Sequence, residues 1–526
     1  MKQTHSIIKI PQFSTLTREQ GGVVVSQAKN VKVVARAGSG KTKLAMAYAA
    51  ARPKARGLYL AFGKPTQLEA STRLRTLGVN TEARTGHSLA WAGFGSKLDA
   101  ACKLTSSGSL RTGITANLLG VNWPVAKAVN ETIRKYMCSA DKEISDKHLP
   151  DERDFPIVRA AAGAIMDNAG TFWKRLTDLD DQEAKAVPDV YIKQWINSDP
   201  VLNYDFILFD ECQDANPLMS HLVEQQNHCS RLYIGDPHQS IYGFRGAVDA
   251  MSTLTVDETH TLTASFRFPK NIGLLASTFL QHWKGEKVPL RGLGAGGRIV
   301  PGDQQAYLAR TVAGLIGKGF ELHSKGHKLH WVKGFEDYRV APIMEAYRLY
   351  KGESSANFQD PVLKLMRSWG ELEDYVEVTG DADAGSVFRL VQQYRDEIPN
   401  IIETLKHEQL RSSDGAPFVL TTAHKAKGLE WPVVRMINDF FSFKDRSDGT
   451  KWLTPERIDP QEANLAYVTL TRAMKAVGPT PELIEWFRQQ PDTQHLFPKP
   501  AETAAPAPAP APAEPEHEAE AVPRAA

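Results

Sequence analysis

Residues 31–42 read VKVVARAGSGKT, a run of β-branched residues that leads directly into a glycine-rich turn ending in lysine and threonine. The run is typical of a buried parallel strand, and the following KLAMAYAAA is typical of a helix. Such a turn directs backbone N–H groups at phosphate, with the positive helix N-terminus behind them. The spacing fits the P-loop pattern, with Ala35 where the general pattern has glycine. The alternative is a plain Gly-Ser turn between a strand and a helix.

Short apolar runs followed by turn residues recur along the chain, which predicts α/β layers built on parallel sheets. Each set of runs is interrupted, the first by an Ala-, Leu- and Lys-rich stretch of helical periodicity, the second by a charged and aromatic stretch. The alternating Ala and Pro of residues 501–526 predict a disordered tail. The first set of expected strands is 31–35, 58–62, 206–210 and 231–235, and the second is 261–266, 306–310, 418–422 and 433–437.

Composition narrows the class of protein. A length of 526 residues corresponds to three or four units at about 150 residues per domain. Hydrophobic residues make up 42% and charged residues 24%, as in ordinary globular proteins. No apolar run is long enough to span a bilayer or to form a signal peptide, so we expect an intracellular, cytoplasmic protein with no membrane partner.

Charge and cysteine usage add two further expectations. The net charge is only +2, so any nucleic-acid site must be a local groove. The cysteines are scattered and form no C-x-x-C pair, which argues against a zinc ribbon or an iron–sulfur cluster. They are Cys102, Cys138, Cys212 and Cys229.

A second motif, DECQD at residues 210–214, follows the apolar run FILF. A carboxylate there can hold Mg²⁺ through water, and its neighbour can accept a proton from an attacking water. We assign the first role to Asp210 and the second to Glu211. Lys41 would reach the outer phosphates and Thr42 would be a further Mg²⁺ ligand, so that ATP and Mg²⁺ are the expected cofactors. The alternative is a solvated acidic turn, which the presence of a P-loop disfavours.

Five more strings accompany these two motifs. LTREQ (16–20) precedes the P-loop, and IGDPHQSIYGFRGA (234–247), LTASFRF (262–268), TTAHKAKGLEW (421–431) and EANLAYVTLTRA (462–473) follow DECQD in that order. With the P-loop and DECQD they resemble the motifs of UvrD/Rep-type superfamily-one DNA helicases. LYLAFGK (58–64) and RTGHSLAW (84–91) extend the resemblance to the helicase core, without an F-box, of the F-box DNA helicases.

This resemblance implies an α/β fold of two RecA-like P-loop NTPase lobes with parallel sheets, each carrying a mainly helical insertion. The expected first lobe is 1–95 and 200–255 with insertion 96–199, and the second is 256–325 and 415–498 with insertion 326–414, followed by a tail at 499–526.

The resemblance also implies how ATP is held between the lobes. Gln20 would hydrogen-bond the adenine edge, and Phe266 would stack on the ring with Lys43 on its other face. Glu430 would approach the ribose. The loop expected to cradle the phosphates is Ala35, Arg36, Ala37, Gly38, Ser39, Gly40, Lys41 and Thr42.

Three residues would complete catalysis from outside the P-loop. Gln239 would sense the γ-phosphate, while Arg267 and Arg472 would act as arginine fingers of the second lobe. An isolated arginine on a helix is ordinarily a solvated surface residue. The strings S-F-R and T-L-T-R-A, in the expected order, favour the catalytic interpretation.

For the DNA track, the resemblance points to aromatic and small polar residues. Aromatic faces stack on bases without reading sequence, and polar groups hold phosphates, so we expect sequence-independent, salt-sensitive binding. Phe62 and Tyr242 could instead be core aromatics. The candidate DNA-binding residues are Phe62, Lys64, Thr85, His87, Tyr242, Phe244, Arg245, Thr422 and His424.

The resemblance therefore implies an ATP-dependent DNA helicase that translocates on single-stranded DNA and unwinds duplex DNA, with 3′-to-5′ polarity inferred from kinship, in replication, recombination or repair. Expected partners are single-stranded DNA and single/double-strand junctions, with single-strand-binding or recombinase proteins as further candidates. Three alternatives stay open: a translocase that strips bound proteins with little unwinding, a non-hydrolysing clamp, and RNA as the track.

Overall fold

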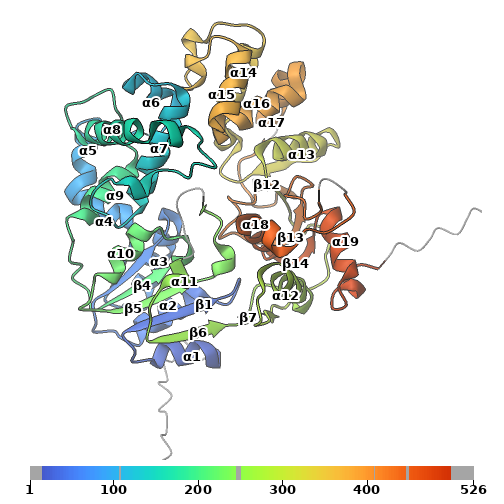
Figure 1. Cartoon of the computed structure of the whole chain (residues 1–526). Coiled ribbons are helices and arrows are strands. Elements are labelled where there is room, and N and C mark those ends of the chain that lie inside the picture. The colour runs from blue at the N-terminus through green and yellow to red at the C-terminus, as the bar shows by residue number, and fades with distance from the viewer. Residues whose placement is uncertain (1–14, 106–107, 244–249, 408, 446–448, 499–526) are drawn as a thin grey trace, which may run out of the picture.

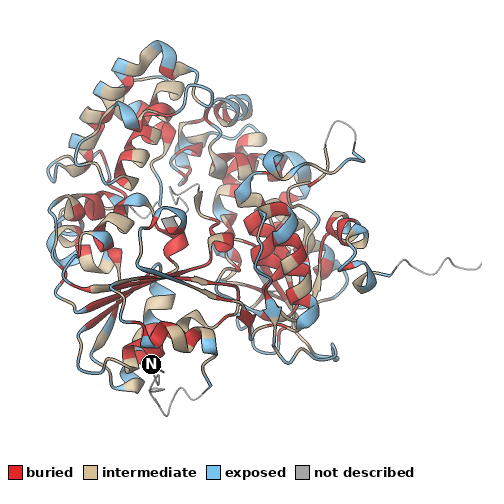
Figure 2. Ribbon diagram, turned by 60° about the horizontal axis from the view of Figure 1, so that its bottom comes forward, coloured by how far each residue is buried: buried red, intermediate tan, exposed pale blue. Residues whose placement is uncertain are grey.

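The computed structural model describes residues 15–105, 108–243, 250–407, 409–445 and 449–498. Within these ranges the chain forms two six-stranded sheets and one two-stranded sheet, all with parallel strand pairing. Each six-stranded sheet carries a helical region above it in Figure 1, and buried residues follow both sheets and their covering helices in Figure 2. The predicted fold class, two α/β lobes with parallel sheets and mainly helical insertions, is confirmed.

The first sheet has the strand order β3-β2-β4-β5-β1-β6. Its central strands β2 and β4 are buried at every residue, as their continuous apolar runs predict. One face packs on α1, α2 and α3, and the other on α10 and the first insertion. The strands are β1 (Asn30–Ala35), β2 (Gly57–Ala61), β3 (Thr81–Thr85), β4 (Phe206–Asp210), β5 (Ser230–Gly235) and β6 (Glu258–Leu262), and the helices are α1 (Arg18–Val25), α2 (Lys41–Ala50), α3 (Lys64–Leu77) and α10 (Pro217–Glu224).

The sixth strand corrects one sequence-based expectation. Residues 261–266 were assigned to the second set of strands, but β6 pairs with β1 in the first sheet, with Ala35 opposite Leu262. The chain crosses to the other lobe only afterwards, through β7 (Ala264–Ser265), which pairs with β8 (Arg291–Gly292). The string ETHTL is polar and lies at a sheet edge, so its composition does not reveal which sheet it joins.

The second sheet has the order β11-β10-β12-β9-β13-β14. Helices α12, α18 and α19 share one core with its strands, and α13 shares another with the second insertion. The strands are β9 (Gln305–Ala309), β10 (Leu329–Trp331), β11 (Gln409–Leu410), β12 (Phe418–Thr422), β13 (Trp431–Met436) and β14 (Ala473–Gly478), and the helices are α12 (Lys270–Lys284), α13 (Val312–Ser324), α18 (Pro460–Leu470) and α19 (Pro481–Gln489).

Two helical regions interrupt the lobes. The interval 326–414 expected for the second insertion includes β10 and β11, which are part of the second sheet, so its helices lie between these strands. Between β3 and β4 lie α4 (Gly86–Ala90), α5 (Ser96–Ala100), α6 (Thr112–Leu119), α7 (Trp123–Cys138), α8 (Ile157–Thr177) and α9 (Pro188–Asn197). Between β10 and β11 lie α14 (Val340–Tyr350), α15 (Trp369–Thr379), α16 (Ala382–Tyr394) and α17 (Ile398–His407), and the short α11 (Ala250–Thr253) precedes β6.

The sheet order determines which loops meet. Strands β4, β5 and β1 are neighbours, so the segments that follow them emerge side by side at the carboxyl edge of the first sheet. These segments are DECQD, GDPHQ and the P-loop. None of the described helices combines the length and the hydropathy needed to cross a bilayer. The predicted tail at 501–526 lies outside the described residues.

Candidate active site

The P-loop follows β1 and ends at the first turn of α2. Gly38 and Gly40 have φ angles of 72° and 82°, a region that side-chain-bearing residues rarely adopt. A Cβ atom at Gly38 would lie 2.3 Å from the Ser265 hydroxyl oxygen and 2.8 Å from Arg267 Cβ. The loop therefore passes directly against the segment that joins the two lobes.

The chemistry of this loop fits a phosphate group. Ser39 is only 2% exposed, and its hydroxyl has no hydrogen-bond partner among the described residues. A buried hydroxyl without a partner is costly, so a ligand oxygen would satisfy it. Thr42 is half-buried in the first turn of α2, where a Mg²⁺ ligand is expected.

Lys41 lies on the acidic end of β4. Its Nζ is 2.6 Å from Glu211 Oε1. Burial acts to lower the pKa of Lys41, but the carboxylates of Glu211, Asp210 and Asp236 outweigh it and raise the pKa. The structure thus joins the P-loop lysine to the DECQD motif.

The two adjacent carboxylates have opposite pKa shifts. Burial, together with the charge of Glu211, raises the pKa of Asp210 to about 6, and the Tyr59 hydroxyl donates a hydrogen bond to Asp210. Burial also acts to raise the pKa of Glu211, but the ammonium groups of Lys41 and Lys427 outweigh it and lower the pKa to about 2. The two carboxylates thus have different environments: burial disfavours the charge of Asp210, whereas two lysines favour the charge of Glu211.

Gln239 connects the two lobes at this edge. Its side-chain amide donates to Asp236 Oδ2 at 2.7 Å, and its Oε1 accepts from Arg472 Nη2 at 3.3 Å. The Gln239 side chain is buried. Asp236 also accepts a hydrogen bond from the Tyr467 hydroxyl of α18 at 3.2 Å.

Both predicted arginine fingers face this site. Arg472 is 1% exposed, and burial together with the nearby charge of Arg267 lowers its pKa to about 9. Arg267 Nε donates to Glu430 Oε2 at 2.6 Å, and its Nη1 donates to the Thr471 carbonyl oxygen at 3.2 Å. The hydrogen bond of Arg472 to Gln239 is the contact that brings this arginine to the first lobe.

The adenine end of the predicted site is assembled around α1. The Gln20 side chain accepts from the Thr17 N–H at 3.0 Å and donates to the Ser39 carbonyl at 2.9 Å. Phe266 is 47% exposed, and its N–H donates to the Gly38 carbonyl at 2.9 Å. Lys43 Nζ is 2.6 Å from Thr15 Oγ1.

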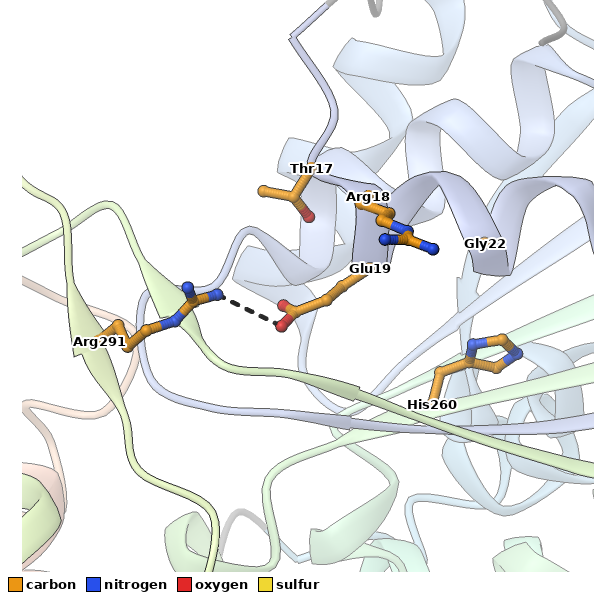
Figure 3. Close-up of a pocket in the computed structure, with 6 residues that line it drawn as sticks. All are labelled: Thr17, Arg18, Glu19, Gly22, His260 and Arg291. Carbon is orange, nitrogen blue, oxygen red and sulfur yellow. Dashed lines mark hydrogen bonds and ion pairs between the residues drawn. The ribbon is translucent and has the colours of Figure 1, made fainter.

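A hollow of about 430 Å³ lies beside the same helix and is drawn in Figure 3. Within it, Arg291 Nη2 is 3.5 Å from Glu19 Oε1. Glu19 also accepts from the N–H of Thr263, the first residue after β6, at 2.9 Å. The helix that bears Gln20 is therefore fixed to the start of the crossover between the lobes. The hollow is lined by Thr17, Arg18, Glu19, Gly22, His260 and Arg291.

Arg36, one of the residues expected to cradle the phosphates, directs its side chain towards protein carboxylates. The Arg36 guanidinium is buried, lies 3.6 Å from Asp236 Oδ1 and pairs with Glu286 of the second lobe. Ala37, next in the loop, donates its N–H to the Tyr467 hydroxyl at 3.3 Å. The Arg36 side chain therefore binds protein carboxylates in this structure.

Some of the predicted DNA-binding residues lie close together. The rings of Phe62 and Tyr242 stack with centroids 5.6 Å apart and an interplanar angle of 12°. Phe62 is 43% exposed, and the Tyr242 hydroxyl donates to the His424 carbonyl of the second lobe at 3.4 Å. Thr85 pairs with Ala61 at the adjoining strand end, next to Phe62. These residues span both lobes on one edge.

The remaining DNA candidates are less closely grouped. Lys64 is the first residue of α3, and His87 Nε2 is 3.6 Å from Asp189 Oδ1. Thr422 is buried at the end of β12, with its hydroxyl accepting the Lys425 N–H at 3.4 Å. Phe244 and Arg245 lie outside the described residues.

Sequence reasoning missed several polar residues of this region. Lys427 Nζ pairs with Asp214 and donates to the Gln239 carbonyl at 2.6 Å. Asp236 and Tyr467 complete the hydrogen bonds around Gln239. All four occur in the quoted motifs, but no local spacing predicts pairs that join the two lobes.

Comparison with known proteins finds the same kind of helicase that the motifs resemble. The UvrD/REP helicase N-terminal domain matches residues 126–258, and the UvrD-like helicase C-terminal domain matches residues 362–477. The resemblance to UvrD/Rep-type DNA helicases that the motifs predict is confirmed by these two matches and by the relatives below.

The chain is 27% identical over 500 residues to the F-box DNA helicase 1 of Gallus gallus, covering 88% of this chain and 48% of that protein. It is 30% identical over 517 residues to the F-box DNA helicase protein 1 of Schizosaccharomyces pombe, covering 88% and 57%. It is 26% identical over 340 residues to DNA helicase IV of Escherichia coli, covering 54% and 49%. The chain thus spans about half the length of the curated relatives it matches.

Proposed function

We propose that this chain is an ATP-dependent DNA helicase that translocates along single-stranded DNA, because it matches both the N-terminal and the C-terminal domain of UvrD-like helicases. The observation that carries the proposal is the contact of Arg472 with Gln239, beside Lys41 and Glu211. A catalytic pocket completed by basic groups of a second lobe couples hydrolysis to relative movement of the lobes.

Each residue has a physical task in hydrolysis. Lys41 and the P-loop N–H groups hold the phosphates, while Thr42 and Asp210 hold Mg²⁺. Bound ATP and Mg²⁺ supply the phosphoryl group and partial neutralisation of its charge. Arg267 and Arg472 stabilise the charge that develops on transfer.

Glu211 is the proposed general base. Its low pKa keeps it ionised at neutral pH, but Lys41 occupies one of its oxygens in this structure. Lys41 must leave Glu211 before that carboxylate can accept a proton from water. We therefore infer that phosphate binding by Lys41 also releases the base.

The strand site is proposed to run past Phe62 and Tyr242. Exposed aromatic faces stack on bases of any sequence, and the stacked pair is supported from the second lobe through His424. Binding should be sequence-independent and should weaken with added salt.

The proposal also covers the direction of translocation, the cellular pathway and the binding partners. We infer 3′-to-5′ movement from the likeness of the DECQD and GDPHQSIYGFRGA strings to that branch of the family. We place the protein inside the cell, at single/double-strand junctions formed in replication, recombination or repair. Single-strand-binding and recombinase proteins are proposed as partners on the strand.

A strand-displacement assay tests this function. Duplexes with a 3′ tail or a 5′ tail are incubated with the full chain, with and without ATP, and the released strand is measured. We expect release from the 3′-tailed duplex with ATP only. Release from neither duplex, combined with ATP-driven clearance of a protein-coated single strand, would favour the stripping translocase. Absence of DNA-stimulated phosphate release would contradict both motor functions.

A further inference from the structure

One short loop of the second lobe touches both candidate sites. The loop joins β12 to β13, and its His424 carbonyl accepts the Tyr242 hydroxyl at 3.4 Å on the strand side. Its Leu429 carbonyl accepts Arg472 Nη1 at 3.4 Å on the nucleotide side, and its Glu430 binds Arg267. The loop therefore contacts groups of both candidate sites, one near each of its ends.

Lys427 lies in the middle of the loop and contacts the first lobe at two places. Its ammonium donates to the Gln239 carbonyl at 2.6 Å and forms an ion pair with Asp214. The same ammonium is 5.2 Å from the centroid of the Tyr242 ring. The side chains of Lys427 and Asp214 are 9% and 1% exposed, so the ion pair is almost fully withdrawn from water.

Two chains of contacts lead from Lys427 to catalytic groups. The first passes through Gln239, whose side chain holds Arg472 at 3.3 Å. The second passes through Asp214 to Gln213, whose amide donates to Asp214 Oδ2 at 3.2 Å and to Glu211 Oε2 at 2.5 Å. Lys427 is thus connected through Gln239 to a proposed arginine finger, and through Asp214 and Gln213 to the proposed base.

Stability alone does not explain this ion pair. Removing two charges from water costs more than their attraction usually returns, so a buried pair is weak evidence for a stabilising role. Asp214 Oδ1 moreover has no hydrogen-bond partner among the described residues, which adds to the cost.

We propose that Lys427 is the positioning residue that couples strand binding at Tyr242 to hydrolysis at Gln239 and Glu211. The proposal rests on the function proposed above. When a base stacks on Tyr242 and shifts its ring, the segment from Gln239 to Tyr242 moves, and Lys427 transmits that movement to the second lobe. Without the lysine, each site still forms, but occupation of one no longer changes the other.

The test uses the full chain and three variants. Lys427→Met removes the charge but leaves Asp214 buried and unpaired, which endangers folding. The double variant Lys427→Met/Asp214→Asn removes both charges and keeps the shape of the pair. Lys475→Met is the matched control, because Lys475 pairs with Asp303 inside the second lobe at 2.8 Å.

Four quantities are measured for each protein: thermal unfolding, affinity for a fluorescent ATP analogue, affinity for oligo(dT), and ATP turnover with and without saturating oligo(dT). We expect the double variant to lose DNA stimulation of turnover by about tenfold, the size of a typical coupling between sites. Both affinities should stay within about threefold of wild type, because neither site loses a contacting group. Lys475→Met should keep the wild-type stimulation.

Full stimulation in the folded double variant would overturn the role of Lys427. So would a stimulation that returns entirely at higher oligo(dT) concentration, because that result makes Lys427 an ordinary strand contact. The wild-type measurement separates the two hypotheses: if oligo(dT) fails to stimulate the wild-type protein, the proposed function fails first.

Discussion

The two lobes carry sheets of the same size and pairing, yet their contributions to the candidate site have opposite character. The first sheet presents the P-loop together with the carboxylates of Asp210 and Glu211. The second lobe presents Arg472 and Lys427 from the segments that flank β13 and β14. In the proposed function, the first lobe therefore supplies the groups that hold a nucleotide and its metal, and the second supplies the groups that respond to it.

This difference predicts unequal effects of substitution. A residue that holds phosphate is needed for every turnover, whereas a residue that stabilises transferred charge changes only the rate. Substitution of the proposed phosphate-binding lysine in the first lobe should therefore abolish hydrolysis, and substitution of a proposed arginine finger in the second lobe should slow it.

The largest effect is expected for Lys41→Ala in the first lobe. Without its ammonium the phosphates lose their principal positive contact, so DNA-stimulated phosphate release should fall to background. Binding of oligo(dT), measured by fluorescence anisotropy, should stay near wild type. Lys54→Ala, an exposed position beyond α2, is the control. Normal turnover in Lys41→Ala would remove the P-loop from the mechanism.

Arg472→Ala in the second lobe should come next. An arginine finger contributes about 10³-fold or more to turnover, and nucleotide affinity should change far less. Because Arg472 is buried and also donates to the Val468 carbonyl, thermal unfolding must be recorded alongside. Arg472→Lys, which keeps the charge, and Arg457→Ala, an exposed second-lobe position, serve as controls. A folded Arg472→Ala with wild-type turnover would leave the arginine a structural residue.

The difference between the two lobes also explains which features could be predicted from the sequence. The P-loop and DECQD are each contiguous strings whose chemistry follows from residue type and spacing, so Lys41 and Glu211 could be singled out as candidates, although the ion pair between them was not predicted. The continuous apolar runs likewise identified central strands such as β2 and β4. Local pattern is sufficient where neighbours in sequence are neighbours in the site.

Contacts that join distant segments were not predictable. Lys427 and Asp214 are separated by 213 positions and lie in different lobes, so no periodicity connects them. The polar strand β6 could have joined either sheet, and its pairing with β1 depends on tertiary packing. The Arg36 side chain binds Glu286 because the second lobe brings a carboxylate to the loop. The candidate site is thus a product of how the lobes meet.

A smaller effect is expected on the strand side of the first lobe. Phe62→Ala should weaken oligo(dT) binding by about tenfold, because each base–aromatic stack contributes about 1–3 kcal/mol. Anisotropy titrations at several salt concentrations measure it, and the salt slope should not change since no phosphate contact is lost. Leu68→Ala, a comparably exposed apolar residue of α3, is the control. Unchanged oligo(dT) affinity in Phe62→Ala would show that the Phe62 ring packs against the protein and does not bind the strand.

The smallest effect concerns the stability of the fold, and it compares a buried carboxylate of the first lobe, Asp210, with a carboxylate of the second lobe, Asp303. Burial raises the pKa of Asp210 from 3.8 to about 6, so between these values the folded protein binds a proton that the unfolded chain has lost. Stability therefore falls as the pH rises through this window, and the cost is fully present above about pH 6. Asp210→Asn removes a cost on the order of 1 kcal/mol while also removing the carboxylate proposed as a metal ligand.

In EDTA and without nucleotide, the thermal midpoint of Asp210→Asn should exceed that of the wild type at pH 8, and the gap should narrow towards pH 4. Asp303→Asn in the second lobe supplies a control of opposite sign. The hydrogen bond from Lys475 lowers the pKa of Asp303, so its ionised form stabilises the fold above pH 3.8 and that contribution is lost as the pH falls further. Asp303→Asn should thus be no more stable than the wild type at pH 8. A pH-independent gap for Asp210→Asn would mean that Lys41 compensates the Asp210 charge fully, and that the acidic edge is maintained at no cost to the fold.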